Sequence, residues 1–325
     1  MEVTIMDPIS HVVVNSAFYS AVSQDSISLD NPTFLATTIG SLIPDGDGIL
    51  QIFGDIPYLK HHRGASHSIL GAIILSALTA LPLSLLFSYN YLSLFGFTLL
   101  GVGSHLFLDW CNSYGIKLLW PISPKMYSCN LLILIEPILI LLSITSILGF
   151  SYDYFFLAWG SIAFMGVYLI SRYLSRINFG NYLFSYFQDK NINKMVVLPA
   201  SKSFFHWDFI VETDYIVYVG QAPIFRRAVR IKEKLSKRIE EEIENSLINK
   251  ALNSKIGKLF QEFTPHYLVK HHKTSDNKHL ITFIDLRYHI GERFLHHATV
   301  KCHNQGMIEE ELFQPYHPNR KVYME

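Results

Sequence analysis

The sequence has little charge, little cysteine and, in its first half, few basic residues. Charged side chains make up 17% of the 325 residues, below the roughly 25% of an average soluble domain. The three cysteines (Cys111, Cys129 and Cys302) are scattered, which excludes a disulfide scaffold and a cysteine-rich zinc module. Lysine plus arginine and aspartate plus glutamate each number 27, so the net charge indicates no acidic or basic partner. The N-terminal MEVTIMDPISH lacks the basic region and the long apolar region of a signal peptide.

The distribution of basic residues divides the chain into two parts. Residues 1–171 contain only four of the 27 lysines and arginines, namely Lys60, Arg63, Lys117 and Lys125. Apolar residues make up 50% of the chain and the mean hydropathy is +0.22, so we expect lipid to surround much of the first part. The sequence predicts a mostly α-helical, polytopic membrane domain over residues 1–177, followed by a cytoplasmic α+β domain over residues 178–325.

Four segments of the first part, each of 18 to 21 residues, are long and apolar enough to cross a membrane. They are residues 68–88, 91–108, 131–150 and 154–171. Two shorter apolar stretches, residues 11–22 and 32–43, predict interfacial or re-entrant helices packed on the bundle. The connections at residues 89–90 and 151–153 carry no lysine or arginine. The positive-inside rule therefore predicts a multi-pass protein of the cell (inner) membrane with both termini in the cytoplasm.

Ionisable groups in or beside the apolar spans mark a candidate site, because such groups are costly in lipid. His105 and Asp109 are four residues apart, so on a helix both side chains share one face. Asp45 and Asp47 share a Pro/Gly turn, where hard oxygen ligands can converge. Histidine and carboxylate without cysteine suit zinc foremost, or manganese or iron. We predict one or two divalent ions held by His11, Asp45, His67, His105, Asp109 and Glu136.

Structural interpretations compete with the metal site for single residues. His11 alone is typical of a satisfied interfacial histidine, the PDGD turn needs no ion, and Glu136 suits a neutral, packed carboxyl group. Arg63 suits an anchor at the lipid headgroups as well as a group that neutralises phosphate. The joint occurrence of these residues, in a segment with almost no other charge, favours the metal site. We expect Asp47, His62 and Arg63 to act in catalysis, and the spacing alone does not decide between His62 and His67 as the closer ligand.

Several short motifs resemble those of a known family, the LexA-regulated, membrane-bound, metal-dependent hydrolases of the inner membrane. The motifs are MDPISH (6–11), IPDGD (43–47), HRGASHS (62–68), HLFLDWCNSYGIKLLWPIS (105–123) and LIEP (134–137). The tail is similar to a longer branch of that family in FFHWDFIVETDYIVYVG (204–220) and IDLRY (284–288). This chain has Glu136-Pro137 where we expect Asp-Pro in the family. The resemblance implies a hydrolase and leaves the substrate open.

A more distant similarity is to the zinc-dependent phospholipase C and single-strand nuclease superfamily. The order His11, Asp45, His62 or His67, His105, Asp109 resembles the ligand order around its zinc cluster. The second helical histidine pair and the amino-terminal tryptophan of those enzymes are not evident. We therefore expect one or two ions instead of a three-metal cluster.

These observations predict a metal-dependent membrane hydrolase. Metal-activated water would cleave a phosphoester or ester of an amphiphilic, lipid-like or lipid-linked substrate at the cytoplasmic membrane face. Two other classes of protein stay open. One is an ion-coupled transporter or channel that uses His105, Asp109 and Glu136, and the other is a non-catalytic membrane scaffold.

The tail alternates apolar and polar residues at 214–220, 267–271 and 279–286, which predicts strands. Residues 225–263 predict one helix with a basic start and an acidic EEEIE run (240–244), facing solvent or anionic lipid. We interpret the histidines at 271–272, 296–297 and 303 as surface residues. No nucleotide loop, nucleophile elbow or nucleic-acid motif is present, so no nucleic acid is expected. We interpret the tail as a regulatory, lipid-positioning or oligomerisation domain, which leaves a homo-oligomer open.

Overall fold

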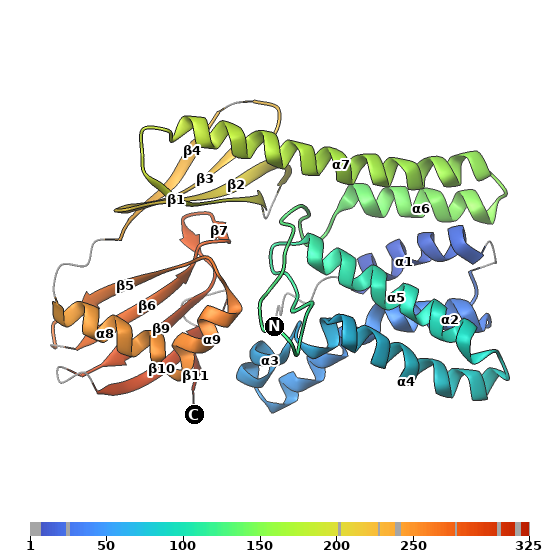
Figure 1. Cartoon of the computed structure of the whole chain (residues 1–325), viewed down its shortest axis with the longest axis horizontal. Helices are drawn as coiled ribbons and strands as arrows, with labels where there is room; N and C mark the ends of the chain where they lie inside the picture. The colour runs from blue at the N-terminus through green and yellow to red at the C-terminus, as the bar shows by residue number, and fades with distance from the viewer. Residues whose placement is uncertain are drawn as a thin grey trace. The chain divides into compact units, whose positions relative to one another are not determined.

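The computed structural model describes residues 8–23, 27–200, 203–226, 228–237, 242–276, 278–303, 307–315 and 320–324. Met6 and Asp7 of MDPISH and residues 240–241 of the acidic run therefore lie outside the described residues. The chain forms two compact units, Met1–Ile52 with His61–Arg176 and Phe53–Lys60 with Ile177–Glu325. The first unit is helical and the second is built on antiparallel sheets (Figure 1). This order, helical region first and α/β region second, confirms the fold class at that level.

The first unit is a bundle of apolar helices. Its elements are α1 (Pro8–Ser23), α2 (Pro32–Leu42), η1 (Ile43–Phe53), η2 (Ala65–His67), α4 (Ile69–Phe87), α5 (Tyr91–Cys111), α6 (Pro137–Ser151) and the first part of α7 (Phe155–Tyr186). Side-chain oxygens of Asn31, Ser68 and Asn90 accept N–H groups at the starts of α2, α4 and α5. Helices α1, α2 and α4 all pack along α5, so α5 is the central element of the bundle.

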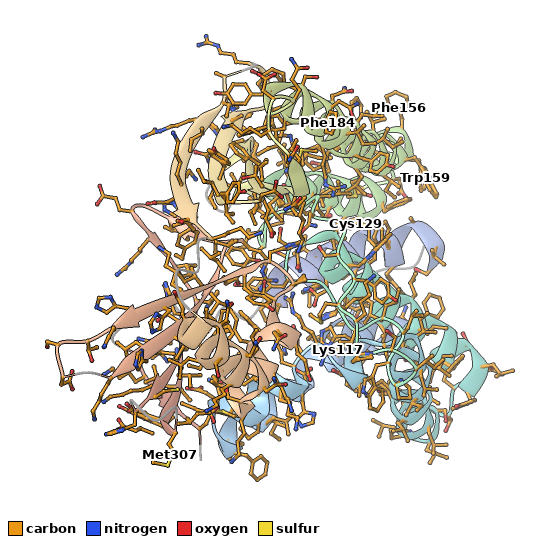
Figure 2. The ribbon with its side chains drawn as sticks, turned by 60° about the vertical axis from the view of Figure 1, so that its left-hand side comes forward. Lys117, Cys129, Phe156, Trp159, Phe184 and Met307 are labelled. Carbon is orange, nitrogen blue, oxygen red and sulfur yellow. The ribbon has the colours of Figure 1, made fainter. Side chains whose placement is uncertain are left out.

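Three of the described helices, α4, α5 and α7, are long and apolar enough to cross a membrane. Phe156 of α7 is 95% exposed and projects away from the helix together with Trp159 (Figure 2), as lipid-facing side chains do. The fourth predicted span, residues 131–150, is helical only over the 15 residues of α6. That helix is about 22 Å long at about 1.5 Å per residue, short of the roughly 30 Å hydrocarbon core. Its predicted length is wrong because Glu136 and Pro137 start the helix late.

The two short N-terminal helices pack into the bundle, as predicted. Asn15 on α1 donates from Nδ2 to the carbonyl oxygen of Thr37 on α2 (3.2 Å), and Thr37 Oγ1 donates to Asn15 Oδ1 (3.0 Å). Ser104 on α5 donates to the same oxygen of Asn15 (3.4 Å). Buried hydrogen bonds between helices are typical of membrane bundles, where apolar packing alone discriminates weakly between partners.

The contact between α2 and α5 depends on two glycines. A Cβ atom at Gly101 would collide with the carbonyl oxygen of Thr37, and one at Gly40 would collide with the carbonyl oxygen of Thr98. Small residues at such positions allow helix backbones to approach closely. The close approach brings the end of α2, and the η1 segment that follows it, against α5.

The first sheet of the second unit is antiparallel, with strand order β1-β2-β3-β4. Its strands are β1 (Ile192–Ala200), β2 (Ser203–Thr213), β3 (Ile216–Pro223) and β4 (Arg230–Ser236). The end of α7 and the residues after it cover one face, where Leu183 and Phe187 pack with Trp207 and Phe209. The sheet also packs against the second sheet through a cluster of buried apolar residues that includes Leu198, Ile210, Leu268 and Ile284.

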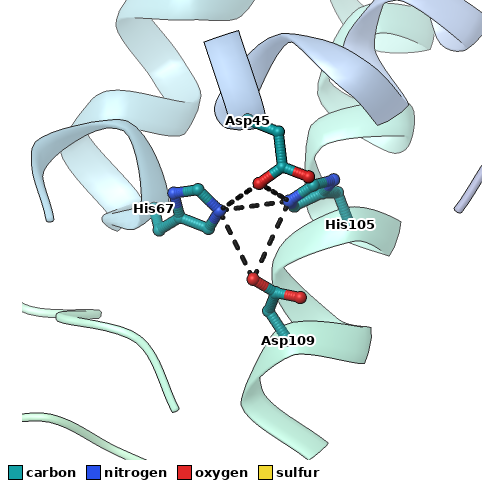
Figure 3. Close-up of side chains that lie close together, drawn as sticks. All are labelled: Asp45, His67, His105 and Asp109. Atoms are coloured by element: carbon teal, nitrogen blue, oxygen red, sulfur yellow. Dashed lines mark hydrogen bonds and ion pairs between the residues drawn. The ribbon is translucent and has the colours of Figure 1, made fainter. Parts of the chain in front are cut away.

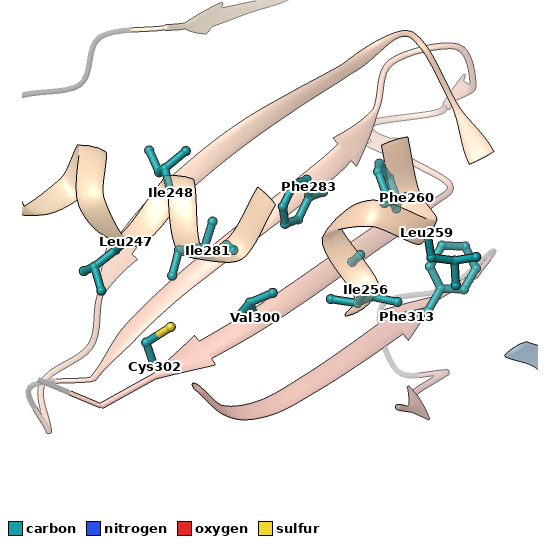
Figure 4. Close-up of a cluster of buried hydrophobic side chains, with 12 residues drawn as sticks. Leu247, Ile248, Ile256, Leu259, Phe260, Ile281, Phe283, Val300, Cys302 and Phe313 are labelled. Carbon is teal, nitrogen blue, oxygen red and sulfur yellow. The ribbon is translucent and has the colours of Figure 1, made fainter. Parts of the chain in front are cut away.

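The second sheet has strand order β11-β10-β9-β6-β5. Its strands are β5 (Tyr267–Lys273), β6 (His279–Asp285), β9 (His297–Cys302), β10 (Ile308–Gln314) and β11 (Val322–Tyr323), and β7 (His289–Ile290) pairs with β8 (Arg293–Phe294). Helices α8 (Glu242–Asn253) and α9 (Lys255–Phe263) cover one face, with Ile256 and Phe260 packed over Phe283 and Val300 (Figure 4). Helix α3 (Asp55–His61) joins this core through its apolar side chains.

The strands predicted in the tail are confirmed by β3, β5 and β6. The single helix predicted over residues 225–263 is wrong, because RIKEKLS forms β4, which pairs with β3. Leu235 of β4 is buried, while Lys234 and Ser236 on either side of it are exposed. Basic residues on the exposed side of this edge strand concealed its alternation. Helix α9 begins after Ser254, whose Oγ accepts the Gly257 N–H.

One predicted surface histidine of the tail is buried. His296 is only 1% exposed, so the surface interpretation is wrong for this residue. It lies near the buried ion pair of the IDLRY motif, in which Arg287 Nη2 donates to Asp285 Oδ2 (2.8 Å). Burying two charges is costly unless both are hydrogen-bonded, and Asp285 also accepts the Thr264 hydroxyl. The motif therefore has a structural role in the second unit.

We expect Gly101→Ala to lower the thermal stability of the detergent-purified protein. The added methyl group would meet backbone at the α2–α5 contact, and overpacking costs about 1–3 kcal/mol. The matched control is Gly103→Ala, on the same helix, where a Cβ would meet nothing within 4 Å. The measurement is the unfolding midpoint Tm of each variant. Equal midpoints for the two variants would contradict the close contact.

Candidate metal centre

Three segments of the first unit bring predicted ligands together. Asp45 lies in η1, His67 ends η2 two residues before the start of α4, and His105 and Asp109 lie one turn apart near the end of α5. The side chains of all four converge (Figure 3). Those of His67, His105 and Asp109 are 0% exposed and that of Asp45 is 14% exposed, so the centre is almost closed to solvent.

The distances among the four side chains fit a divalent ion. His67 Nε2 lies 3.1 Å from His105 Nε2 and 3.3 Å from both Asp45 Oδ1 and Asp109 Oδ2. His105 Nε2 lies 3.5 Å from the Asp45 oxygen and 3.9 Å from the Asp109 oxygen. All four atoms lie within 4.8 Å of one another. Tetrahedral zinc with bonds of about 2.0–2.1 Å places its ligand atoms about 3.3 Å apart, which is close to what these atoms adopt.

Hydrogen bonds outside the centre orient the two imidazole rings. His105 Nδ1 donates to the carbonyl oxygen of Ser41 (2.8 Å), which leaves the Nε2 lone pair directed at the centre. Ser66 Oγ donates to Asp47 Oδ2 (2.7 Å) and lies 2.9 Å from His67 Nδ1. The hydroxyl therefore accepts a hydrogen bond from His67 Nδ1–H and connects the ring to the Asp47 carboxylate. Outer contacts of this kind fix the tautomer of metal-binding histidines.

A second group of possible ligands adjoins the first. Asp45, Asp47 and His62 each offer one atom, and these atoms lie within 4.8 Å of one another. His62 Nδ1 is 2.7 Å from Asp47 Oδ1, and Asp47 Oδ2 also accepts the backbone N–H of Arg63 (3.1 Å). Asp45 belongs to both groups, so its carboxylate lies between them.

His11 and Arg63 contact the centre from two further sides. The His11 ring stacks on His105 with centroids 4.0 Å apart, and its Nε2 is 3.6 Å from Asp109 Oδ1. Neither ring nitrogen of His11 has a hydrogen-bond partner among the described residues, and both are buried. Arg63 Nε lies 3.4 Å from Asp109 Oδ2, and Arg63 Nη1 donates to Asn112 Oδ1 (3.2 Å). Arg63 is 5% exposed, whereas the side chain of an anchor among solvated headgroups would be accessible to water.

The electrostatics of the centre favour a positive charge between the carboxylates. Burial lowers the pKa of His67, but hydrogen bonds with Asp109, Asp45 and Asp47 outweigh it and raise that pKa to about 10. Burial raises the pKa of Asp45, whereas its contacts with His105 and His67 hold the pKa well below its usual range. The ionised carboxylates therefore stabilise a proton or another cation at the His67 nitrogen.

The structure does not bring Glu136 to this centre. Glu136 Oε1 accepts the Ile133 N–H (3.0 Å) and Oε2 accepts the Tyr168 hydroxyl (2.8 Å). Glu136 is also the N-cap residue of α6. Its carboxylate thus fastens the extended segment before α6 to α7.

Sequence reasoning missed three groups that support the centre. Ser66 lies next to His67, and its Oγ connects His67 with Asp47. Asn112 follows Asp109 by three residues, and its Oδ1 accepts from Arg63 and from the Tyr114 N–H (2.8 Å). The third group is the Ser41 carbonyl, a backbone atom that carries no sequence signal. His61, next to His62, is exposed and belongs to neither group of ligands.

Comparisons with known proteins match both units. A family model described as YdjM inner membrane protein matches residues 6–179, which include every residue of both ligand groups. A second model, the YfhP C-terminal alpha/beta plait domain, matches residues 246–323. The chain is 27% identical to the "Uncharacterized protein YfhP" of Bacillus subtilis (strain 168) over 328 residues, which cover 94% of this chain and 96% of that protein. No solved structure matches the chain.

We expect Ser66→Ala to weaken divalent-metal binding about 10- to 100-fold, the usual effect of losing an outer partner of a histidine ligand. The variant leaves His67 Nδ1 without its 2.9 Å partner, so only the longer contact with Asp47 Oδ2 (3.5 Å) remains to orient the ring at that nitrogen. The measurement is competition of detergent-purified protein with a chromophoric zinc chelator. Ser84→Ala is the matched control, because Ser84 Oγ donates to the Leu81 carbonyl of its own helix, away from the centre. Unchanged affinity in Ser66→Ala would contradict the orienting role.

Proposed function

The chain belongs to the YdjM inner membrane protein family, and we propose that it is a metal-dependent hydrolase of the inner membrane. The observation that carries the proposal is the convergence of two imidazole nitrogens and two carboxylate oxygens at 3.1–3.9 Å. Their donor set, nitrogen and oxygen without sulfur, suits zinc foremost, and manganese or iron after it.

The two groups of ligands support one or two ions. Asp45, His67, His105 and Asp109 would hold the first, with His11 beside the second oxygen of Asp109. Asp45, Asp47 and His62 would hold a second. A bound divalent ion lowers the pKa of its water towards about 7 and polarises an ester or phosphoryl oxygen.

Residues of the chain would supply proton transfer and charge neutralisation. In the one-ion form, Asp47 holds His62 through Nδ1, so the imidazole is positioned to accept a proton from the attacking water at Nε2. Arg63, fixed between Asp109 and Asn112, brings a cation close to the site of charge development. A guanidinium in this position suits a phosphoryl oxygen in particular.

The placement of the centre favours an amphiphilic substrate. His67 lies two residues before the start of α4 and Asp109 lies in the last turn of α5, so the centre lies at the ends of two apolar helices instead of midway along them. The η1 segment that carries Asp45 also exposes Ile49 and Ile52. Exposed apolar side chains beside a polar centre suit a lipid or lipid-linked ester.

The distribution of basic residues supports a multi-pass topology with the centre at the cytoplasmic face. The turn between α4 and α5 and the turn between α6 and α7 carry no lysine or arginine. Lys60, Arg63, Lys117, Lys125 and Arg172 lie towards the opposite ends of these helices. By the positive-inside rule these ends, and with them both termini, face the cytoplasm.

The test of the metal centre is elemental analysis of the full-length protein, purified in detergent without chelator. We expect about one or two zinc, manganese or iron ions per wild-type chain. We expect none in the His105→Ala/Asp109→Ala double variant, because it removes two of the four converging ligands. His61→Ala, which changes an exposed neighbour outside both groups, is the control and should retain the metal. A folded wild-type protein without metal would overturn the proposal.

The test of hydrolysis uses the metal-loaded protein with phosphomonoesters, phosphodiesters, carboxylic esters and phospholipid micelles. We expect Asp109→Asn to reduce turnover more than about 100-fold, beyond the loss usual for an outer contact, and His61→Ala to leave it unchanged. A protein that binds the ion but cleaves none of these substrates would contradict the hydrolase assignment. That result would direct attention to ion transport instead.

A further inference from the structure

The second unit contains a cavity of about 590 Å³ that the proposed function does not use. Its walls come from β1, β2, β3, β4, β5, α8 and the residues next to them. Strands β4 and β5 are the edge strands of the two sheets, so the cavity opens where both sheets end. A volume between about 300 and 1,000 Å³ is usual for small-molecule sites.

Lysines dominate the charge of this cavity. Four lysines (Lys194, Lys234, Lys237 and Lys270) and two glutamates (Glu212 and Glu244) line it, together with His271. With the histidine neutral, this is an excess of two positive charges. The whole chain has a net charge of zero, so the excess is a local feature.

The two glutamates are already engaged. Glu212 Oε1 accepts from Lys237 Nζ (2.6 Å), and Glu244 Oε1 lies 3.3 Å from His271 Nδ1. Three lysines form no salt bridge with a carboxylate among the described residues, although Glu212 lies close enough to Lys194 to favour its charged form. The three come from different strands: Lys194 from β1, Lys234 from β4 and Lys270 from β5.

The three lysines are all exposed and differ in their contacts. Lys194 is fixed, because its Nζ donates to the carbonyl oxygen of Pro265 (2.6 Å). Desolvation lowers the pKa of the exposed Lys194 side chain, so its charged form is destabilised and a nearby anion would stabilise it. Lys234 and Lys270 are exposed and, on their long side chains, can close on a ligand from the two strand edges.

We propose that this cavity binds a phosphate monoester, held by Lys194, Lys234 and Lys270. A phosphate monoester carries close to two negative charges at neutral pH, which matches the excess of the lining. Three lysines from separate strands offer point charges around one phosphate group, a common mode of phosphate binding. The phosphate could belong to a soluble metabolite or to a phosphorylated lipid headgroup, since both present the same group.

The binding test uses the full-length protein in phosphatidylcholine nanodiscs and two probes with the same phosphate. One arm titrates glycerol 3-phosphate by calorimetry. The other measures co-flotation with phosphatidylcholine vesicles that contain or lack phosphatidic acid. We expect binding in at least one arm and an at least tenfold weaker affinity in Lys234→Glu/Lys270→Glu, because charge-assisted hydrogen bonds are lost and repulsion is added.

The matched control is Lys273→Glu, an exposed lysine of the same strand β5 that does not line the cavity. We expect it to bind within about twofold of wild type, since a screened surface charge contributes little. Equal weakening by both variants would reduce the effect to general surface charge and overturn the proposal. Failure of the wild-type protein to bind either probe would also overturn it.

The two arms separate the sources of the phosphate. Binding of glycerol 3-phosphate assigns a soluble ligand, and binding to phosphatidic acid vesicles alone assigns a lipid headgroup. The test is independent of the metal centre, because every lining residue of the cavity lies at position 194 or beyond. If the metal proposal failed, the phosphate proposal would be unaffected, and the reverse also holds.

Discussion

Two carboxylates and two imidazoles held together away from water form the constraint on which the first unit depends. An ionised carboxylate in a buried position is stable only beside a compensating cation and with its lone pairs occupied. Asp109 therefore lies against Arg63 and His67, and Asp45 lies against both histidines. Ser66, Asn112 and the Ser41 carbonyl support part of the centre, whereas both His11 ring nitrogens and Asp109 Oδ2 have no hydrogen-bond partner among the described residues.

The helix packing and the centre are parts of one arrangement. The glycine contact between α2 and α5 brings the end of α2 against α5, and there the Ser41 carbonyl meets the His105 ring. Four residues later the chain supplies Asp45. A change in the separation of α2 and α5 would therefore alter the orientation of one ligand and the position of another. The geometry of the centre therefore depends on the close backbone contact between α2 and α5, which lies some distance from it.

Much of the centre could be predicted from the sequence because its ligands occur in short, local patterns. The four-residue spacing of His105 and Asp109 fixes their common face on a helix, and an Asp or His in an otherwise uncharged segment is conspicuous. Glu136 met the same criterion but binds Ile133 and Tyr168 instead, since charge scarcity identifies a buried carboxyl and does not identify its partner. Ser66 and the Ser41 carbonyl could not be predicted, because their roles exist only after the helices pack.

The fold could be predicted where apolar and polar residues alternate regularly along the chain. Strands β3, β5 and β6 alternate openly, whereas β4 has lysine, arginine and glutamate along its exposed edge and resembles a charged helix in composition. The length of the apolar run at residues 131–150 was equally misleading. Hydropathy cannot distinguish an extended apolar segment from the helix that follows it, and the helix start was decided by Glu136 and Pro137.

Helix α7 has 32 residues, which correspond to about 48 Å. This length exceeds a hydrocarbon core of about 30 Å by about 18 Å. Leu183 and Phe187, around which the first sheet is packed, lie at or beyond its far end. Helix α7 thus begins in the first unit, and its last turns contribute to the hydrophobic core of the second.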